Sequence, residues 1–230
     1  MISIVASIAN NALKLNIKKT IILILFINTA YANDIIYKQD GDYRIISNKH
    51  LINDLPYKSN DLYQILVEIP TGSRDKWEVN HETGNLEWEF KNGKPRQVKF
   101  LGYPGNYGFI PQTLSGDNDP LDIIVLSETA QRGATLNIKV IGMIRLMDKG
   151  EEDNKVIAIT IKGGFSKIDS LKEMLLKKPN VIKIIKDWFE GYKAPGKIVF
   201  MGYENRKNTI AHIEKTHERW SSINNVKTIP

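Results

Sequence analysis

The sequence contains no cysteine, which excludes both disulfide bonds and thiol chemistry. Long apolar runs are also lacking: the most compact one, at residues 21–27, falls well short of the ~20 residues that a transmembrane helix needs. There is no block of Lys and Arg of the kind that marks a nucleic-acid-binding patch. What is present is an ordinary globular composition, 42% hydrophobic and 25% charged. With 230 residues, it predicts a chain that folds as a single domain.

The N-terminal residues have the order of a secretory signal peptide. Three lysines between residues 14 and 19 precede the apolar run, and Ala-Tyr-Ala at residues 30–32 is a small-x-small cleavage site. We therefore expect cleavage after Ala32, a periplasmic or secreted location and no stable membrane association. An uncleaved anchor and a wrongly assigned start codon, which would leave the protein cytoplasmic, are the alternatives. Loss of residues 1–32 would lower the formal net charge from +6 to +3, so the basic balance says little about partners.

After a polar leader at residues 33–60, the pattern predicts one domain, residues 61–230, made mostly of strands. Runs of β-branched and apolar residues bounded by turn residues predict strands at 62–69, 76–79, 86–90, 121–126, 135–146, 156–161 and 197–201. The segment 91–122 is expected to be rich in loops. Helices are expected from a capping box at Ser170, from a cap at Asn180 and at residues 209–220. This pattern favours a mainly β, barrel-like core with two or three helices packed on it.

The segment with the most direct chemical meaning is Asp-Asn-Asp-Pro-Leu-Asp at residues 117–122. Three carboxylates so close together repel one another, and a bound cation would offset that cost. Oxygen ligands without a nearby Cys or His select Mg²⁺, Mn²⁺ or Ca²⁺ over Zn²⁺. A solvated acidic turn is the alternative for this segment taken alone. An EF-hand loop fits less well, because Pro120 and the apolar residues after it break that pattern.

Together with five other segments, the acidic segment resembles the soluble inorganic pyrophosphatases of the one-domain, magnesium-dependent class. In the order of that family, the segments are residues 67–70, 76–78, 93–96, 103–108 and 191–193. The resemblance implies hydrolysis of pyrophosphate to two orthophosphates by direct attack of Mg²⁺-bound hydroxide, in a homo-oligomer. Pattern and resemblance together predict a mainly β (α+β) fold, a five-stranded OB-like β-barrel with peripheral helices.

The resemblance also implies the metal ligands of the site. They would be Asp117, Asp119, Asp122, Asp148 and Asp153, with Glu68 supporting the cluster. Asp119 would in addition take a proton from the water between two of the ions. Several Mg²⁺ ions per site are expected, with Mn²⁺ as a substitute. Such ions neutralise the phosphoryl oxygens and lower the pKa of bound water from ~15.7 toward neutrality.

Basic and hydroxyl side chains would hold the two phosphoryl groups. By the same resemblance they are Lys76, Arg96, Tyr103, Tyr107, Lys155, Tyr192 and Lys193, with Glu78 orienting its basic neighbours. Asp119, Tyr107 and Lys155 would act most directly in catalysis. Phosphoryl transfer depends mostly on positioning and electrostatic stabilisation, so a ring of such donors suits the reaction.

The chain departs from the family at Lys149, where a second acid commonly follows the residue matching Asp148. This change could weaken one metal site. Tyr192 lies on the apolar stripe of its helix, where an aromatic residue is more often part of the core. The four histidines form no metal-binding spacing, and the two at residues 212 and 217 are expected to be solvated on the last helix.

Two other functions are compatible with parts of the pattern. One is an OB-type module that binds single-stranded nucleic acid without chemistry, but the clustered carboxylates argue against it, and no nucleic-acid partner is expected. The other is an exported, metal-dependent phosphohydrolase that acts on a different phosphate compound.

Overall fold

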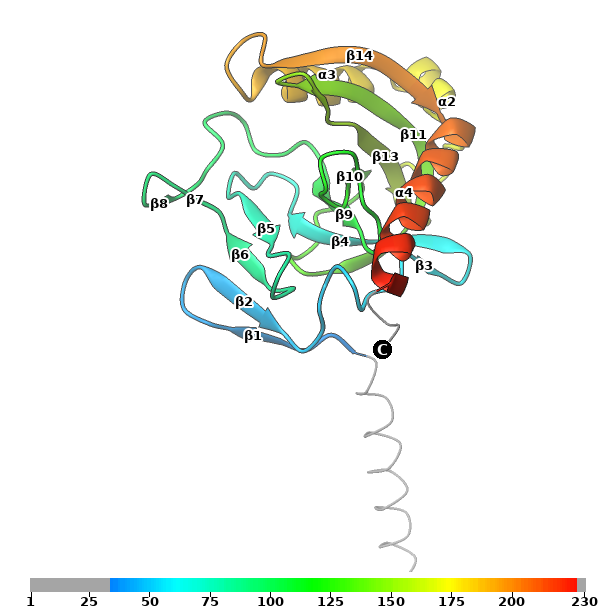
Figure 1. The fold of residues 1–230 in the computed structure, drawn as a ribbon. Coiled ribbons are helices and arrows are strands. Elements are labelled where there is room, and N and C mark those ends of the chain that lie inside the picture. Colours follow the sequence, from blue (N-terminus) through cyan, green and yellow to red (C-terminus); the bar gives the residue numbers. More distant parts are fainter. Residues whose placement is uncertain (1–33, 227–230) are drawn as a thin grey trace, which may run out of the picture. The chain divides into compact units, whose positions relative to one another are not determined.

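Five strands form the centre of the fold, and their pairings run from strand to strand until the last returns to the first (Figure 1). In the order of pairing they are β4 (Leu62–Ile69), β9 (Asn106–Ile110), β10 (Leu121–Leu126), β13 (Lys155–Thr160) and β11 (Thr135–Asp148). Within this ring β10 and β13 run parallel, whereas the other four pairings, including that of β11 with β4, are antiparallel. The predicted mainly β fold with an OB-like barrel is confirmed.

The structure is a computed structural model, and it describes residues 34–226 of the chain. The predicted signal peptide, residues 1–32, lies outside the described residues. From Tyr37 onward the chain forms one compact unit. Between residues 34 and 226, no helix combines the length and the apolar character needed to cross a bilayer.

Residues 37–59, which were expected to form a polar leader, contribute three strands. They are β1 (Tyr37–Gln39), β2 (Arg44–Ser47) and β3 (Lys58–Ser59). The β1–β2 hairpin extends the hairpin of β5 (Trp77–Val79) and β6 (Leu86–Trp88), because β2 pairs with β6. In that pairing Ile45 lies opposite Leu86, a long-range contact that local polarity does not reveal. Paired strands therefore begin before the expected domain start at residue 61.

Four shorter or peripheral strands complete the sheets. They are β7 (Phe90–Lys91), β8 (Lys94–Pro95), β12 (Glu151–Glu152) and β14 (Ile198–Asn205). β7 and β8 form a hairpin of their own within the segment expected to be loop-rich. β12 and β14 both pair with β11, and β14 extends well beyond the predicted strand at residues 197–201.

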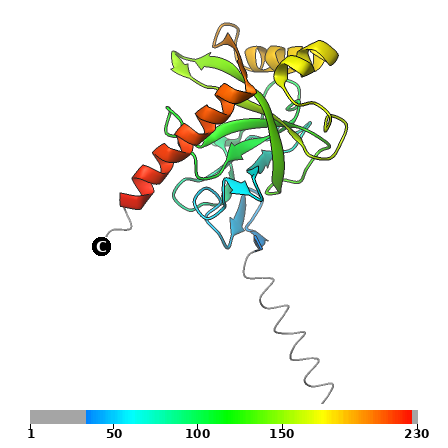
Figure 2. The ribbon, with the colours of Figure 1, turned by 90° about the vertical axis from the view of Figure 1, so that its right-hand side faces the viewer.

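Three helices in the described part of the chain lie on the barrel (Figures 1 and 2). They are α2 (Leu171–Lys177), α3 (Pro179–Gly191) and α4 (Arg206–Val226). Ser170 caps α2 as predicted, because its hydroxyl accepts from the N–H of Glu173 at 3.1 Å. The predicted cap of α3 is wrong: Lys178 is the N-cap, and Asn180 lies in the first turn. Pro179 takes the first helical position, which its fixed φ favours.

Neighbouring residues of β10 and β13 belong to two different hydrophobic clusters. Ile124 and Ile157 join the cluster that includes α2 and α3, whereas Ile123 and Val156 join the one that includes Ile213 of α4. Because successive side chains of a strand point to opposite faces, both faces of these strands are buried. This explains why their sequences are almost continuously apolar.

β9 was missed in the sequence, where residues 103–108 were expected to be a loop. All five of its residues are buried, and it pairs with both β4 and β10. A Cβ atom built at Gly108 would lie 1.8 Å from the carbonyl oxygen of Leu66. The glycine therefore permits the close approach of two strands rather than a turn.

We predict that Gly108→Ala strongly destabilises the barrel. The new methyl group would collide with backbone that cannot move aside, so β9 and β4 would have to separate, at a cost of about 3 kcal/mol or more. Urea denaturation measures the change. Gly116→Ala is the matched control, because no atom lies within 4 Å of its Cβ position. Equal stability of the two variants would contradict this account of β9.

Candidate active site

The acidic segment forms a turn at the start of β10. The N–H of Asp119 donates to Oδ1 of Asp117 at 3.1 Å, and the N–H of Ser115 donates to the carbonyl of Asp119 at 2.8 Å. From α4, the guanidinium of Arg219 donates to the carbonyl of Ser115 and to Oδ1 of Asn118. Asn118 has a φ of +68°, a left-handed conformation that Asn tolerates. Local hydrogen bonds and α4 thus hold the turn in place.

Lys155 is the buried cation of the site, with 3% of its surface exposed. Its ammonium donates to the carboxylates of Asp122 and Asp153. The parallel pairing sets Ile123 opposite Val156, so the preceding residues, Asp122 and Lys155, lie together at the same end of β10 and β13. Burial alone would lower the pKa of Lys155, but the two carboxylates raise it above its ordinary value. The amine therefore stays charged.

A cavity of about 520 Å³, here called the acidic cavity, contains several of the predicted residues. They are Glu68, Lys76, Glu78, Tyr107, Asp119 and Asp122, joined by Glu87 and Glu89. Lys76 and Glu78 form an ion pair at 2.6 Å. Glu68 is 6% exposed and accepts from the N–H of Val79 at 2.8 Å. Its burial raises its pKa to about 8.

A second cavity, of about 1150 Å³, is here called the basic cavity. Of the predicted residues it is lined by Arg96, Asp148, Tyr192 and Lys193. Lys193 donates to Oδ2 of Asp148 at 2.7 Å. Nη1 of Arg96 donates to the carboxylate oxygens of Glu89 at 2.5 and 2.7 Å. Because Glu89 lines the acidic cavity, this ion pair joins the two cavities.

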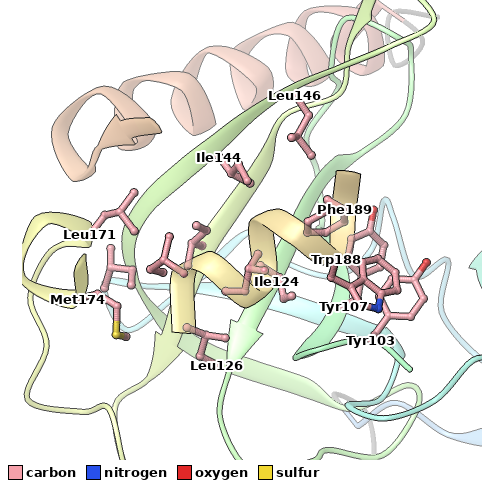
Figure 3. Packing of buried hydrophobic residues seen from close by; sticks show 14 of the residues in the cluster. Tyr103, Tyr107, Ile124, Leu126, Ile144, Leu146, Leu171, Met174, Trp188 and Phe189 are labelled. Atoms are coloured by element: carbon pink, nitrogen blue, oxygen red, sulfur yellow. The ribbon is translucent and has the colours of Figure 1, made fainter. Parts of the chain in front are cut away.

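Two buried tyrosines form an aromatic wall beside the site, and Figure 3 shows them gathered with Trp188 at one end of the core cluster. The ring centroids of Tyr103 and Tyr107 are 5.0 Å apart, and Tyr103 lies 4.3 Å from Trp188. Burial raises the pKa of Tyr103 to about 12, and burial together with Asp122 raises the pKa of Tyr107 well above its ordinary value. Both hydroxyls therefore keep their protons at neutral pH and can donate hydrogen bonds.

Tyr192 both packs in the core and borders the site, the two positions that the sequence suggested for it. Its ring stacks on Trp188 with centroids 4.7 Å apart and packs against the core cluster. It also lines the basic cavity beside Lys193. Core packing thus fixes a residue that borders the site.

The predicted metal ligands do not all line one cavity. Asp117 and Asp153 line a small cavity of about 30 Å³, and Asp122 lines both this cavity and the acidic one. Asp148 borders the basic cavity. In the described residues, no three carboxylate or imidazole groups converge as a complete set of metal ligands. Lys155 contacts Asp122 and Asp153 in the arrangement seen here.

Sequence analysis missed His81, whose Nε2 lies 3.5 Å from Oδ1 of Asp119 on the wall of the acidic cavity. The turn between β5 and β6 places it there. In that turn the side chain of Asn80 accepts from the N–H groups of Glu82 and Thr83. The available signal was its position in the turn that directly follows the strand of Lys76 and Glu78.

The expectation that the last two histidines are solvated is wrong. The ring of His217 stacks on Tyr57 with centroids 3.6 Å apart, and its Nδ1 lies 2.7 Å from the carbonyl oxygen of Gln112. His212 lines the small cavity, and burial lowers its pKa. Both residues are half-buried, because they flank the buried positions 209, 213 and 216 of α4, which packs on the barrel.

The inorganic pyrophosphatase family profile matches residues 65–221, more than half of the chain. The chain belongs to the inorganic pyrophosphatase family. The inorganic pyrophosphatase of Bos taurus is 32% identical over an alignment of 206 residues, which covers 76% of this chain and 70% of the bovine protein. The inorganic pyrophosphatase of Schistosoma japonicum is 26% identical, with a TM-score of 0.73 over 83% of this chain and 80% of that one.

A further solved structure shows the fold alone, because its identity is lower. It is the truncated vacuolar soluble pyrophosphatase of Trypanosoma cruzi in complex with PPi, with a TM-score of 0.78 at 23% identity. The match covers 84% of this chain and 92% of that one.

Inorganic pyrophosphatases depend on divalent metal ions, generally Mg²⁺, and the residues of this chain fit such an ion. All the predicted ligands offer carboxylate oxygens, which hard cations prefer. Oδ1 of Asp148 is buried and has no hydrogen-bond partner among the described residues. Burial, reinforced by Asp117, raises the pKa of Asp119. Both observations indicate negative charge that a cation would stabilise.

We predict that, with divalent ions chelated, the free energy of unfolding falls as pH rises from about 4.5 to about 8. The pKa of Glu68 is 4.5 ordinarily and about 8 in the folded chain, so the folded state holds an extra proton across this window. The loss is on the order of a few kcal/mol. Urea denaturation at the two ends of the window measures it.

Glu68→Gln provides the control, because its amide oxygen can still accept from the N–H of Val79. This variant should lose most of the pH dependence. If it kept the full dependence of the unaltered chain, Glu68 would not be its source.

Proposed function

We propose that the chain hydrolyses inorganic pyrophosphate to two orthophosphate ions where the acidic and basic cavities meet. Hydrolysis of pyrophosphate is the activity of the family to which the chain belongs. The observation that best supports this location is the ion pair between Arg96 of the basic cavity and Glu89 of the acidic cavity. It joins a region suited to cations to a region suited to phosphoryl groups, and the reaction requires both.

The predicted carboxylates would form the metal-binding half of the site. They are Asp117, Asp119, Asp122, Asp148 and Asp153, with Glu68 in support. Bound Mg²⁺ supplies charge neutralisation at the phosphoryl oxygens and lowers the pKa of coordinated water. We propose several such ions per site, with Mn²⁺ able to replace them, because both ions prefer oxygen ligands.

Asp119 would accept the proton of the attacking water. It lines the acidic cavity together with Glu68 and Asp122, and an ionised carboxylate in that place can serve as a general base. Direct attack by water requires no nucleophilic side chain. No phosphorylated enzyme is therefore expected.

The cationic side chains would divide between the two phosphoryl groups. Lys76 lines the acidic cavity and Lys155 contacts Asp122 there, so both would hold the phosphoryl group that is attacked. Arg96 and Lys193 line the basic cavity and would hold the departing group. Tyr103, Tyr107 and Tyr192 would add hydroxyl donors. Donors held in place by packing stabilise the developing charge without having to reorganise.

We also propose that the chain is exported and forms a homo-oligomer. The order of the N-terminal residues supports export. An apolar edge supports association: β14 exposes Val199 and Met201, which are 48% and 47% accessible. Native mass spectrometry of the protein from fractionated cells tests both proposals. We expect an N-terminus at Asn33 and the mass of several chains; an intact N-terminus or a single chain would contradict the corresponding proposal.

We predict that Asp119→Asn lowers kcat for pyrophosphate by about 10²–10⁴, because the amide cannot take the proton of the attacking water. Phosphate release at saturating Mg²⁺ measures the change, and circular dichroism checks that the variant is folded. Asp187→Asn is the matched control: this exposed residue of α3 pairs with Lys183, away from both cavities. Unchanged turnover in Asp119→Asn would exclude the role proposed for Asp119.

The unaltered chain should release phosphate from pyrophosphate with Mg²⁺, and much less from a phosphomonoester. Release from ATP alone would contradict the proposed substrate.

A further inference from the structure

The basic cavity carries far more positive charge than the predicted pyrophosphate ligands supply. Four segments line it: the stretch between β4 and β5, the stretch that includes the β7–β8 hairpin, the turn after β11 and the loop before β14. In Figure 1 the hairpin and the loop lie on the side of the barrel away from α4. The cationic residues of the lining are Arg74, Lys91, Lys94, Arg96, Lys99, Lys149, Lys193 and Lys197. Asp148 is the acidic residue among the lining side chains.

Few of these charges are offset by carboxylates. Arg96 pairs with Glu89, and Lys193 pairs with Asp148. In the described part of the chain, the other lysines of the cavity form no ion pair within 4 Å and are exposed. Exposed ammonium groups gathered around one hollow repel one another, and a polyanion would relieve that repulsion.

The position of Lys149 adds to this charge. It has a φ of +54° in the turn that joins β11 to β12, immediately after Asp148. There it lines the basic cavity, and it is not among the residues that line the acidic cavity or the small one. Lys149 therefore places a further cation beside Asp148 and Lys193 in the basic cavity.

We propose that the basic cavity extends the site to bind linear phosphate chains of three or more phosphoryl groups, either free or carried by a nucleoside 5′-triphosphate. The inference rests on the proposed function, because the first two phosphoryl groups occupy the pyrophosphate site. Lys94, Lys149 and Lys197 contact the third group and those beyond it. The volume of about 1150 Å³ exceeds the usual range of ligand pockets and is well above the need of one phosphoryl group.

Calorimetric titration with non-hydrolysable, methylene-bridged analogues of pyrophosphate, tripolyphosphate and ATP tests the proposal. The variant is the triple substitution Lys94→Gln, Lys149→Gln and Lys197→Gln. The matched control is Lys162→Gln, Lys167→Gln and Lys172→Gln, which removes the same charge from exposed lysines outside the three cavities. All titrations use one fixed concentration of free Mg²⁺.

The triphosphate analogue should bind the unaltered chain at least about tenfold more tightly than the diphosphate analogue. The triple variant of Lys94, Lys149 and Lys197 should reduce the ratio of these two affinities about tenfold, as the loss of three exposed charge contacts implies. The control variant of Lys162, Lys167 and Lys172 should leave the ratio unchanged. Equal ratios in the two triples, or no preference in the unaltered chain, would overturn the proposal. Tighter binding of the tripolyphosphate analogue than of the ATP analogue would identify free chains as the ligand, and the reverse would identify nucleotides.

The same chain assayed for pyrophosphate hydrolysis separates the two proposals. Titration needs no turnover, so a chain that hydrolyses pyrophosphate but shows no preference for the longer analogue refutes the extension alone. A chain that binds the longer analogue but does not hydrolyse pyrophosphate refutes the proposed function alone.

Discussion

A buried ammonium held between two carboxylates is the interaction on which the rest of the site depends. Lys155 contacts Asp122 and Asp153 at the end of the parallel pair β10 and β13. Removing one partner of a buried ion pair typically costs about 3–5 kcal/mol, because the other charge is left uncompensated. The three side chains stay together only while the two strands keep their register. The register at the centre of the barrel and the charge of the site therefore depend on each other.

The barrel separates opposite charges that would otherwise neutralise one another. Strands β4, β5, β6 and β10 and the residues next to them supply the carboxylates of the acidic cavity. The loop after β4, the stretch around the β7–β8 hairpin and the loops beside β11 and β14 supply the cations of the basic cavity. The ion pair of Arg96 and Glu89 lies at the junction. An aromatic wall of Tyr103 and Tyr107 backs the site and keeps its donors rigid. Pyrophosphate with its metal ions carries the complementary charges: the cations suit the acidic cavity, and the phosphoryl oxygens suit the basic cavity.

The sequence predicted those strands whose own residues show how they are buried, but not the contacts that distant segments make. Strands β10 and β13 were recognisable because both of their faces are buried, which makes them almost continuous apolar runs. Strands β4 and β11 were recognisable because β-branched and apolar residues recur along them. β9 was not, since Gly105 just before it and Gly108 within it resemble turn residues, and Gly108 is needed only because another strand passes close by. His81 lies near Asp119 because of the way the turn between β5 and β6 folds, and the spacing of residues in the sequence does not reveal this contact. Lys149 could be read as a change near the metal ligands, but only the path of the chain after β11 shows that it borders the basic cavity.

The turnover number of Lys155→Met for pyrophosphate, at saturating Mg²⁺, tests the central claim most directly. Methionine keeps most of the length of the side chain and removes its charge. The account predicts that kcat falls at least about a hundredfold in the folded variant, the loss expected when one preorganised donor to the developing charge is removed. A kcat within about threefold of that of the unaltered chain would contradict it.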